Sequence, residues 1–469
     1  MFRFLKKRTQ RDNKQRRSRQ QNNRSLRFES LERRALLAGD VTVALVGTTL
    51  SFDGDASANE VEITPGASVG VYNIVGLNNT IINGPTTIVD PFDLIEVDLE
   101  GGSDTFTIRG TSVSNKIVIA GDINIDNDDG NNTNKLINVQ LNDDLTIIKT
   151  GGTSESNVEI IGTLIVGDVI LDTAFFDGDS KTVINGDSRI QGDLTIDNDD
   201  GEDHFVCFAS TIDGNVDINN RDGDTRTVFG ISEDPIIFGS LTISNGDGND
   251  KVFIHDTDIW EDVDIDNGNG HTLVSVQTSD IGLGAPVGGD GDFDLDNLVG
   301  IDELSFVDST VRDDFEVNNG GGEAFGSRTV IDGASVGRSL TFDGDGGLDI
   351  ITMTDSRIVQ LADFDLFDGA SDLNFISVLF LGPLDIDGDD GNDVLFFERT
   401  TVEGDADISL GDGQDTLELV DGTKLLGSSQ LFGDDGIDTL IRQVAPAADA
   451  IVIAFLADET FELDQFILS

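Results

Sequence analysis

The chain has 469 residues and a formal net charge of −60, with 89 Asp and Glu against 29 Lys and Arg. So acidic a protein repels nucleic acid and anionic lipid headgroups, which argues against both as partners. Hydrophobic residues make up 38% of the chain and include 28 Phe, enough for a large core. The single cysteine, Cys207, makes no intramolecular disulfide, and no run of 18 apolar residues predicts a membrane-spanning helix.

The N-terminal segment differs in charge from everything after it. Residues 1–34 hold 13 Lys and Arg against three acidic residues, whereas the rest of the chain holds 16 basic and 86 acidic side chains. The stretch "LRFESLERRALLAGD" (26–40) resembles the N-terminal LEPR-XLL motif of large secreted or surface proteins of planctomycete bacteria. The matching residues are Leu31, Glu32, Arg34, Leu36 and Leu37, with Arg33 in place of the usual Pro.

This resemblance covers about 40 residues and implies export to the cell surface or the exterior, without indicating an activity. We therefore expect residues 1–40 to be a basic, disordered leader. A disordered basic arm that binds nucleic acid or membrane is the alternative, although the acidic remainder would oppose binding to nucleic acid. Residues 41–95 predict short strands that form an N-terminal β cap.

A repeat occupies residues 96–442. Related copies are "LTIDNDDGEDHFVCF" (194–208), "LTISNGDGNDKVFI" (241–254), "LDIDGDDGNDVLFF" (384–397) and "ADISLGDGQDTLEL" (406–419). From Asp104 to Asp438 there are fourteen intervals over 334 residues, which gives a repeat of roughly 24 residues. An Asp closes many of the acidic loops: Asp203, Asp250, Asp302, Asp349, Asp393, Asp415 and Asp438.

Within each repeat, apolar residues alternate with polar ones on both sides of the Gly/Asp loop. Leu384 and Ile386 precede the loop, Leu395 and Phe397 follow it, and a third short "S/T-x-I/V" segment comes next. Alternation with a period of two indicates half-buried strands. Three short strands in about 24 residues predict an all-β parallel β-helix of about 15 coils. A β-propeller is the alternative, but its blades need about 40 residues each.

Stacking of the coils would place the acidic loops in columns of carboxylates about 5 Å apart. Calcium suits such columns, because it accepts six to eight oxygen ligands in flexible geometry. The favoured alternative is plain turn chemistry, since Gly, Asp and Asn favour tight turns and charged edges oppose aggregation. If calcium binds between coils, the predicted ligands are Asp247, Asp250, Asp389, Asp393, Asp412, Asp415, Asp434 and Asp438.

The acidic loops do not fully match either of two known calcium-binding loops. No register of the loop after Asp385 satisfies the EF-hand, because Gly391 or Phe396 falls where a ligand is needed. "LGDGQDTLE" (410–418) and "FGDDGIDTL" (432–440) resemble the glycine- and aspartate-rich nonapeptides of repeat-in-toxin proteins, which bind calcium between adjacent turns. The spacing of about 24 residues differs from that family's nine, so only the idea of half-sites on successive coils carries over.

No residue set predicts catalysis. His204, His255 and His271 have no metal-ligand spacing, and Cys207 alternates with Phe205 and is expected to be buried and inert. Trp260 and Tyr72 are too few for an extended sugar-binding platform, and the Phe residues are better explained as core ladders. Residues 443–469 lose the loop motif and predict a C-terminal cap.

The sequence thus predicts a secreted or cell-surface, non-enzymatic β-solenoid with a structural, adhesive or matrix role. Its expected partners are polysaccharides or proteins of the cell envelope or exterior, and calcium is its cofactor if the acidic columns bind metal between coils. The alternative is a polysaccharide-active β-helix enzyme, a lyase or a hydrolase. The longest repeat intervals, near 104–132 and 272–302, are the places to look for its cleft.

Overall fold

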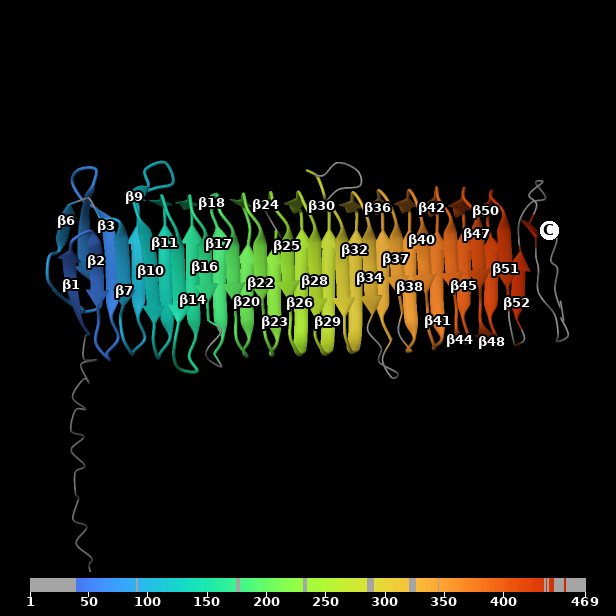
Figure 1. Ribbon diagram of the computed structural model, residues 1–469, viewed down its shortest axis with the longest axis horizontal. Helices are drawn as coiled ribbons and strands as arrows, with labels where there is room; N and C mark the ends of the chain where they lie inside the picture. The colour runs from blue at the N-terminus through green and yellow to red at the C-terminus, as the bar shows by residue number, and fades with distance from the viewer. Residues whose placement is uncertain are drawn as a thin grey trace, which may run out of the picture. The chain divides into compact units, whose positions relative to one another are not determined.

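The computed structural model describes residues 39–89, 92–173, 178–230, 234–284, 291–319, 326–344, 346–433, 436, 438–442 and the backbone of 451–452. All of the regular elements in these ranges are β-strands, and none is a helix that could cross a membrane. The strands form three long parallel sheets, which we number 1 to 3 in the order in which each coil visits them. Strands of one sheet lie side by side along the long axis of the view, in chain order (Figure 1).

Sheet 1 begins each coil, and each of its strands pairs in parallel with its counterpart in the next coil. Its strands are β7 (Leu94–Asp98), β10 (Asp122–Asn127), β13 (Leu145–Lys149), β16 (Val169–Asp172), β19 (Leu194–Asp197), β22 (Val216–Asn219), β25 (Leu241–Ser244), β28 (Val263–Asn267), β31 (Phe293–Asn297), β34 (Phe315–Asn319), β37 (Leu340–Asp343), β40 (Ala362–Asp365), β43 (Leu384–Asp387), β47 (Ala406–Ser409), β51 (Ser429–Phe432) and β53 (Ile451–Val452).

Sheet 2 follows the acidic loop of each coil. Its strands are β8 (Thr105–Arg109), β11 (Asn132–Ile137), β14 (Ser156–Ile161), β17 (Ser180–Asn185), β20 (Asp203–Cys207), β23 (Thr225–Phe229), β26 (Gly248–His255), β29 (Gly270–Gln277), β32 (Gly300–Val307), β35 (Arg328–Asp332), β38 (Asp349–Thr354), β41 (Ser371–Ile376), β45 (Val394–Glu398), β49 (Thr416–Val420) and β52 (Thr439–Arg442). In the loops before β45 and β49, β44 (Asp390–Gly391) pairs with β48 (Asp412–Gly413).

Sheet 3 closes each coil with a very short strand. Its strands are β9 (Ile117–Ile119), β12 (Val139–Leu141), β15 (Leu164–Ile165), β18 (Ser188–Ile190), β21 (Ser210–Ile212), β24 (Ile236–Ile237), β27 (Asp258–Ile259), β30 (Asp280–Ile281), β33 (Thr310–Val311), β36 (Ser335–Val336), β39 (Arg357–Ile358), β42 (Leu379–Phe380), β46 (Thr401–Val402) and β50 (Lys424–Leu425). Because this sheet has 14 strands, one per coil, the described residues contain 14 complete coils.

The parallel β-helix predicted from the sequence is therefore confirmed, with slightly fewer coils than the 15 expected. Most registers between successive sheet 1 strands advance by 22 to 25 residues, as from Leu194 to Val216 and from Val216 to Leu241. The longest step is from Val263 to Phe293. The minimal coil is thus 22 residues, and insertions at the corners raise the mean toward the predicted 24.

Strands β1 (Asp40–Val46), β2 (Thr49–Asp53), β3 (Glu60–Pro65), β4 (Val71–Gly76), β5 (Ile81–Asn83) and β6 (Thr87–Val89) precede the first complete coil. Here β1 pairs with β2, β3 with β4 and β4 with β6 in antiparallel fashion, while β2 and β3 join β7 and β8 in parallel. The predicted leader (1–40) and C-terminal cap (443–469) fall almost entirely outside the described residues.

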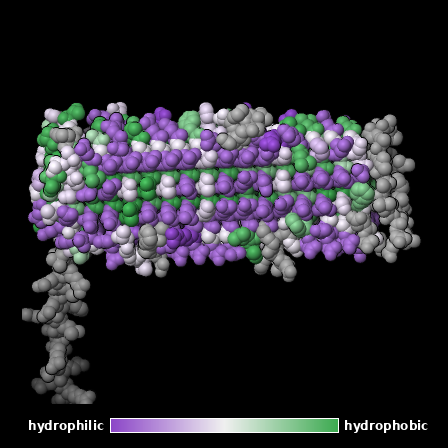
Figure 2. All heavy atoms as spheres, in the orientation of Figure 1, coloured by the Kyte–Doolittle hydropathy of each residue, from purple (hydrophilic) through white to green (hydrophobic). Residues whose placement is uncertain are grey.

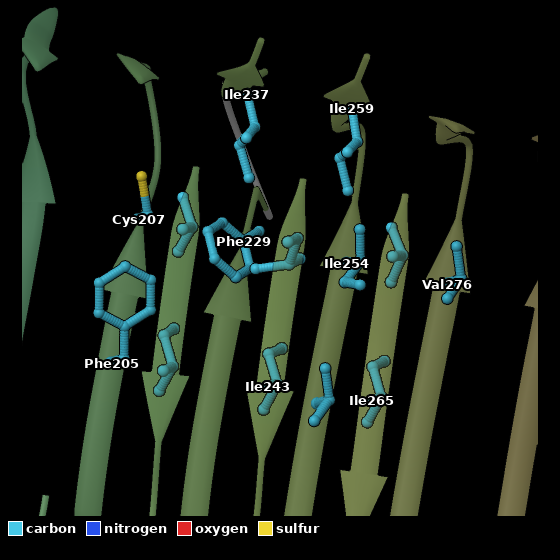
Figure 3. Close-up of a cluster of buried hydrophobic side chains, with 14 of the residues drawn as sticks. Phe205, Cys207, Phe229, Ile237, Ile243, Ile254, Ile259, Ile265 and Val276 are labelled. Atoms are coloured by element: carbon cyan, nitrogen blue, oxygen red, sulfur yellow. The ribbon is translucent and has the colours of Figure 1, made fainter. Parts of the chain in front are cut away.

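Apolar side chains from all three sheets fill the interior as ladders. Figure 3 shows Cys207, Ile254 and Val276 from sheet 2, which the register makes equivalent, below Ile237 and Ile259 from sheet 3. Aromatic rings also pack against one another along the ladders. Phe293 and Phe315 make an edge-to-face contact with their ring centroids 5.0 Å apart. Such burial in every coil supplies the main driving force for stacking.

The single cysteine and the histidines lie where the alternation predicts. Cys207 is fully buried, and burial raises the pKa of its thiol to about 12, so it is inert. His204 is exposed, and the His255 ring lies beside the Ser275 hydroxyl at 3.1 Å.

Candidate metal centre at the first corner

We call the turns from sheet 1 to 2, 2 to 3 and 3 to 1 the first, second and third corners. Each corner carries its own column of polar side chains that bond to the coil beside it. At the second corner, hydroxyls accept backbone N–H groups, as where Ser279 Oγ accepts Thr257 N–H at 3.2 Å. At the third corner, Asp168 Oδ1 accepts Asp193 N–H at 2.9 Å. The acidic loops form the first corner.

The first corner contains a buried asparagine ladder at the C-terminal ends of the sheet 1 strands. Asn198, Asn220, Asn245, Asn267, Asn297 and Asn319 occupy this position in six successive coils. Each side-chain amide donates to the amide oxygen of the next, with N–O distances of 2.7 to 2.9 Å. From sequence alone, these asparagines were predicted only to favour tight turns, and the ladder was not expected.

A second column, which we call the closing column, lies at the start of the sheet 2 strands. From Ser180 onward it alternates between hydroxyl and carboxylate residues, then ends in three Asp. Its members are Asp104, Asn132, Ser156, Ser180, Asp203, Thr225, Asp250, Thr272, Asp302, Ser327, Asp349, Ser371, Asp393, Asp415 and Asp438.

Each Asp of the closing column bonds to the preceding coil through one oxygen. Asp203 Oδ1 accepts Ser180 N–H at 2.8 Å, and Asp250 Oδ1 accepts both N–H (3.0 Å) and Oγ1–H (2.7 Å) of Thr225. The other oxygen, Oδ2, is buried without a hydrogen-bond partner in Asp104, Asp203, Asp250, Asp393 and Asp415. A buried carboxylate with an unpaired oxygen is costly unless it is protonated or bound to a cation.

Burial shifts the titration of these groups accordingly. It raises the pKa of Asp203 and Asp393 to about 6 and that of Asp104 and Asp415 to about 7. For Asp415, repulsion from the stacked Asp393 and Asp438 adds to the effect of burial.

The eight residues predicted as calcium ligands separate into two groups. Asp250, Asp393 and Asp415 are buried in the closing column, and Asp438 is its last, half-buried member. Asp247, Asp389 and Asp412 are exposed in the loops, and Asp434 lies outside the described residues. The backbone register stacks Asp412 on Asp390 rather than on Asp389. The exposed Asp247 accepts N–H and Nδ2–H of Asn269 at 2.9 and 2.7 Å.

Two further carboxylate groups lie at the third corner. Asp292, Asp313 and Asp314 converge there, but Arg338 already neutralises them, with its Nη1 2.8 Å from Asp314 Oδ2 and 3.3 Å from Asp313 Oδ1.

The other group, Asp122, Asp143 and Asp144, includes the fully exposed Asp143. Its pKa is raised chiefly by the charge of Asp122. The third-corner groups differ from the first corner in another way: Asp122, Asp143 and Asp144 are not buried, and the buried Asp313 lies beside the Arg338 guanidinium.

One coil holds a cation of its own at the first corner. Lys149, the last residue of β13, occupies the ladder position, is fully buried, and donates to the carbonyl oxygens of Gly130 (2.7 Å), Ser154 (3.0 Å) and Glu155 (3.3 Å). Burial lowers its pKa to about 8. The nearest members of the closing column, Asn132, Ser156 and Ser180, carry no charge.

No protein-family model matches this chain, and neither a curated protein nor a solved structure shows detectable similarity to it. The fold and the geometry of its corners and faces therefore carry the functional argument.

The outer face of sheet 1 bears two columns of side chains, at the second and fourth residues of its strands. Between β28 and β47 they are mainly carboxylates, including Asp264, Asp294, Asp363, Asp385 and Asp407. Burial against their neighbours, with added repulsion from nearby acidic groups, raises the pKa of Asp294 to about 6. Rows of hydrophilic residues run along the stack over most of the face seen in Figure 2.

Two features of the surface were not foreseen. Near the N-terminal end, a groove of about 530 Å³ lies over sheet 1, and its lining includes Asp53, Glu96, Asp98 and Asp126. At the third corner, the partly exposed rings of Phe238 and Trp260 pack with centroids 4.7 Å apart. Phe238 was expected in the core with the other Phe residues, because sequence alternation does not reveal which way a corner residue points.

The two longest repeat intervals owe their length to different corners. Residues 110–116 extend the second corner between β8 and β9, and the other interval is lengthened between Ile281, at the end of β30, and Phe293, at the start of β31. The neighbouring strands of sheet 3, β9 and β30, are the first and eighth of that sheet and lie seven coils apart. The described parts of the two segments therefore border no common cleft.

Proposed function

We propose that this protein is an exported, acidic, non-catalytic solenoid with a structural, adhesive or matrix role at the cell surface. The observation that carries the proposal is the outer face of sheet 1, where carboxylates repeat in strict register along successive coils. A rigid row of charges at a spacing of about 4.8 Å suits multivalent contact with an extended polymer, because each added contact is intramolecular.

The partner that fits this face is a polysaccharide or protein of the envelope or exterior that carries cationic groups. The Phe238–Trp260 pair supports a polysaccharide, since aromatic rings present an apolar face with polar surroundings. Export is supported by the resemblance of residues 26–40 to the LEPR-XLL motif.

Binding can be tested by cosedimentation of the purified protein with isolated envelope polysaccharide. We expect binding that weakens with salt, because solvent-exposed charges are screened. A triple variant of the sheet 1 face, Asp363→Asn with Asp385→Asn and Asp407→Asn, should bind several-fold more weakly. The matched control is Asp256→Asn with Asp308→Asn and Asp355→Asn at the second corner. Those residues have φ of +49°, +47° and +47°, which Asn tolerates. Equal binding by both triple variants would contradict the proposed surface.

Export can be tested with residues 1–45 fused to a reporter in a planctomycete host. We expect the reporter in the medium or at the cell surface. A second fusion with Leu36→Asp and Leu37→Asp, which disrupts the apolar part of the motif, should stay inside. Cytoplasmic retention of the unmodified fusion would count against export.

The groove beside Glu96 favours one second candidate, a polysaccharide hydrolase or lyase. Paired carboxylates beside a groove are the minimum that glycoside hydrolysis requires. The cosedimentation samples distinguish the two functions: new reducing or unsaturated ends that disappear in Glu96→Gln would establish the enzyme and overturn the structural role.

A further inference from the structure

The closing column changes its charge spacing near its C-terminal end. From Ser180 to Asp393 hydroxyl and carboxylate residues alternate, so buried carboxylates lie two coils, about 9.6 Å, apart. Beyond that point Asp393, Asp415 and Asp438 follow one another in consecutive coils. Carboxylates at a spacing of about 4.8 Å in a buried corner repel strongly.

In the same coils, side-chain oxygens of the closing column lack hydrogen-bond partners. Three coils before Asp393, Ser327 Oγ donates to Asp349 Oδ1 at 2.6 Å and accepts Asn319 Nδ2–H at 2.8 Å. In the following coils Ser371 Oγ, Asp393 Oδ2 and Asp415 Oδ2 are all buried without a hydrogen-bond partner. Three unpaired oxygens in consecutive coils mark a place that a ligand would complete.

Space for that ligand lies beside Gly388, which follows β43. A Cβ at this position would lie 2.8 Å from Asp393 Oδ2 and 2.8 Å from the carbonyl oxygen of Leu410 in the next coil. The missing side chain therefore leaves a small space between oxygens of two adjacent coils. The two polar atoms nearest to that Cβ position are both oxygens.

The Lys149 coil shows that this corner accommodates a positive charge. The register between coils places Lys149, the last residue of β13, and Gly388, the residue after β43, at equivalent positions. The Lys149 ammonium group lies among three carbonyl oxygens there. Beside Lys149, which supplies a cation, the closing column is neutral. Beside Gly388, which has no side chain at the equivalent position, the closing column is most acidic.

We propose that the first corner binds one calcium ion between the coils of Asp393 and Asp415, with Asp393 Oδ2, Asp415 Oδ2 and the Leu410 carbonyl oxygen as ligands. Equivalent oxygens one coil apart are separated by about 4.8 Å, so an ion midway between them lies about 2.4 Å from each. That is the distance calcium requires, whereas magnesium needs about 2.1 Å. The site concerns the interior of the stack, so it is independent of the proposed surface role.

Thermal unfolding of the full chain, after removal of metal with EDTA, tests the site. We expect about 1 mM calcium to raise the melting temperature of the wild type, because calcium binds only the folded state. Titration calorimetry should detect one tight calcium site per chain, with magnesium binding at least tenfold more weakly. Asp415→Ser restores the alternation of hydroxyl and carboxylate residues seen elsewhere in the closing column. This variant should therefore lose the calcium site, yet its melting temperature in EDTA should equal or exceed that of the wild type.

Two control variants locate the effect. Asp389→Asn with Asp412→Asn removes exposed loop carboxylates, and Asp302→Asn removes a closing-column carboxylate whose neighbours are hydroxyl residues. Both control variants should keep the increase in melting temperature with calcium. Asp415→Asn, which keeps the shape of the side chain, should lose that increase and serves as the test variant if Asp415→Ser fails to fold. The proposal is overturned if calcium leaves the wild type unchanged, if Asp415→Ser and Asp415→Asn retain the response, or if the exposed-loop variant loses it.

Discussion

Lowering the pH from about 8 to about 5, without divalent cations, is expected to stabilise the solenoid by on the order of 3 kcal/mol. The closing column causes this effect. Burial raises the pKa of Asp104 to about 7 and that of Asp203 to about 6, from the ordinary 3.8. Because the folded-state pKa lies above the unfolded value, the folded state takes up protons first as the pH falls. The stabilisation is complete below about pH 4 and is lost as the pH rises through 6 and 7.

Urea unfolding at several pH values measures this dependence. The double variant Asp104→Asn with Asp203→Asn should have a flatter profile, and Asn already serves in this column at Asn132, whose Oδ1 accepts Asp104 N–H. The matched control is Asp247→Asn, because hydrogen bonds from Asn269 lower the pKa of Asp247 instead. Stability that stays constant or falls on acidification would show that these carboxylates are not buried as described.

Replacing Asn267 with Leu is expected to destabilise the solenoid by about 2–4 kcal/mol. Asn267 Oδ1 accepts Asn245 Nδ2–H at 2.7 Å, and Asn267 Nδ2 donates to Asn297 Oδ1 at 2.8 Å. The substitution leaves one buried donor and one buried acceptor without these bonds. Leu366 and Leu410 occupy the equivalent position in later coils, so the side chain fits and the loss reports on hydrogen bonding.

Chemical denaturation of the variant measures the loss. Asn318→Leu is the control, because Asn318 lies on the exposed face of sheet 1 and should change stability by less than about 0.5 kcal/mol. Equal effects at the two positions would contradict a structural role for the ladder.

Much of the fold follows from local patterns in the chain. Alternation in "LTISNGDGNDKVFI" predicts that Leu241, Ile243, Val252 and Ile254 point inward, and each is at most 1% exposed. The repeat length predicts three short strands per coil, and the register between coils confirms it. These features are predictable because strand alternation and coil length depend only on residues close in sequence.

The acidic loops are different, because their residues are alike in composition but not in environment. Asp247 and Asp250 are three residues apart, yet the first is exposed and the second is 1% exposed. Their loops repeat Asp and Gly so often that several alignments between coils are equally good. The stacking of Asp412 on Asp390 is therefore visible only in the structure.

The sequence alone determined the β-helix, its inward ladders, its acidity and the loops in which carboxylates gather. Only the tertiary structure decided which carboxylates face the interior, that the asparagines form a ladder, and that Asp393 and Asp415 lie one coil apart beside Gly388. The physical reason is that the direction of a corner side chain depends on the coil stacked next to it. That neighbour is 22 or more residues away, beyond the reach of any local pattern.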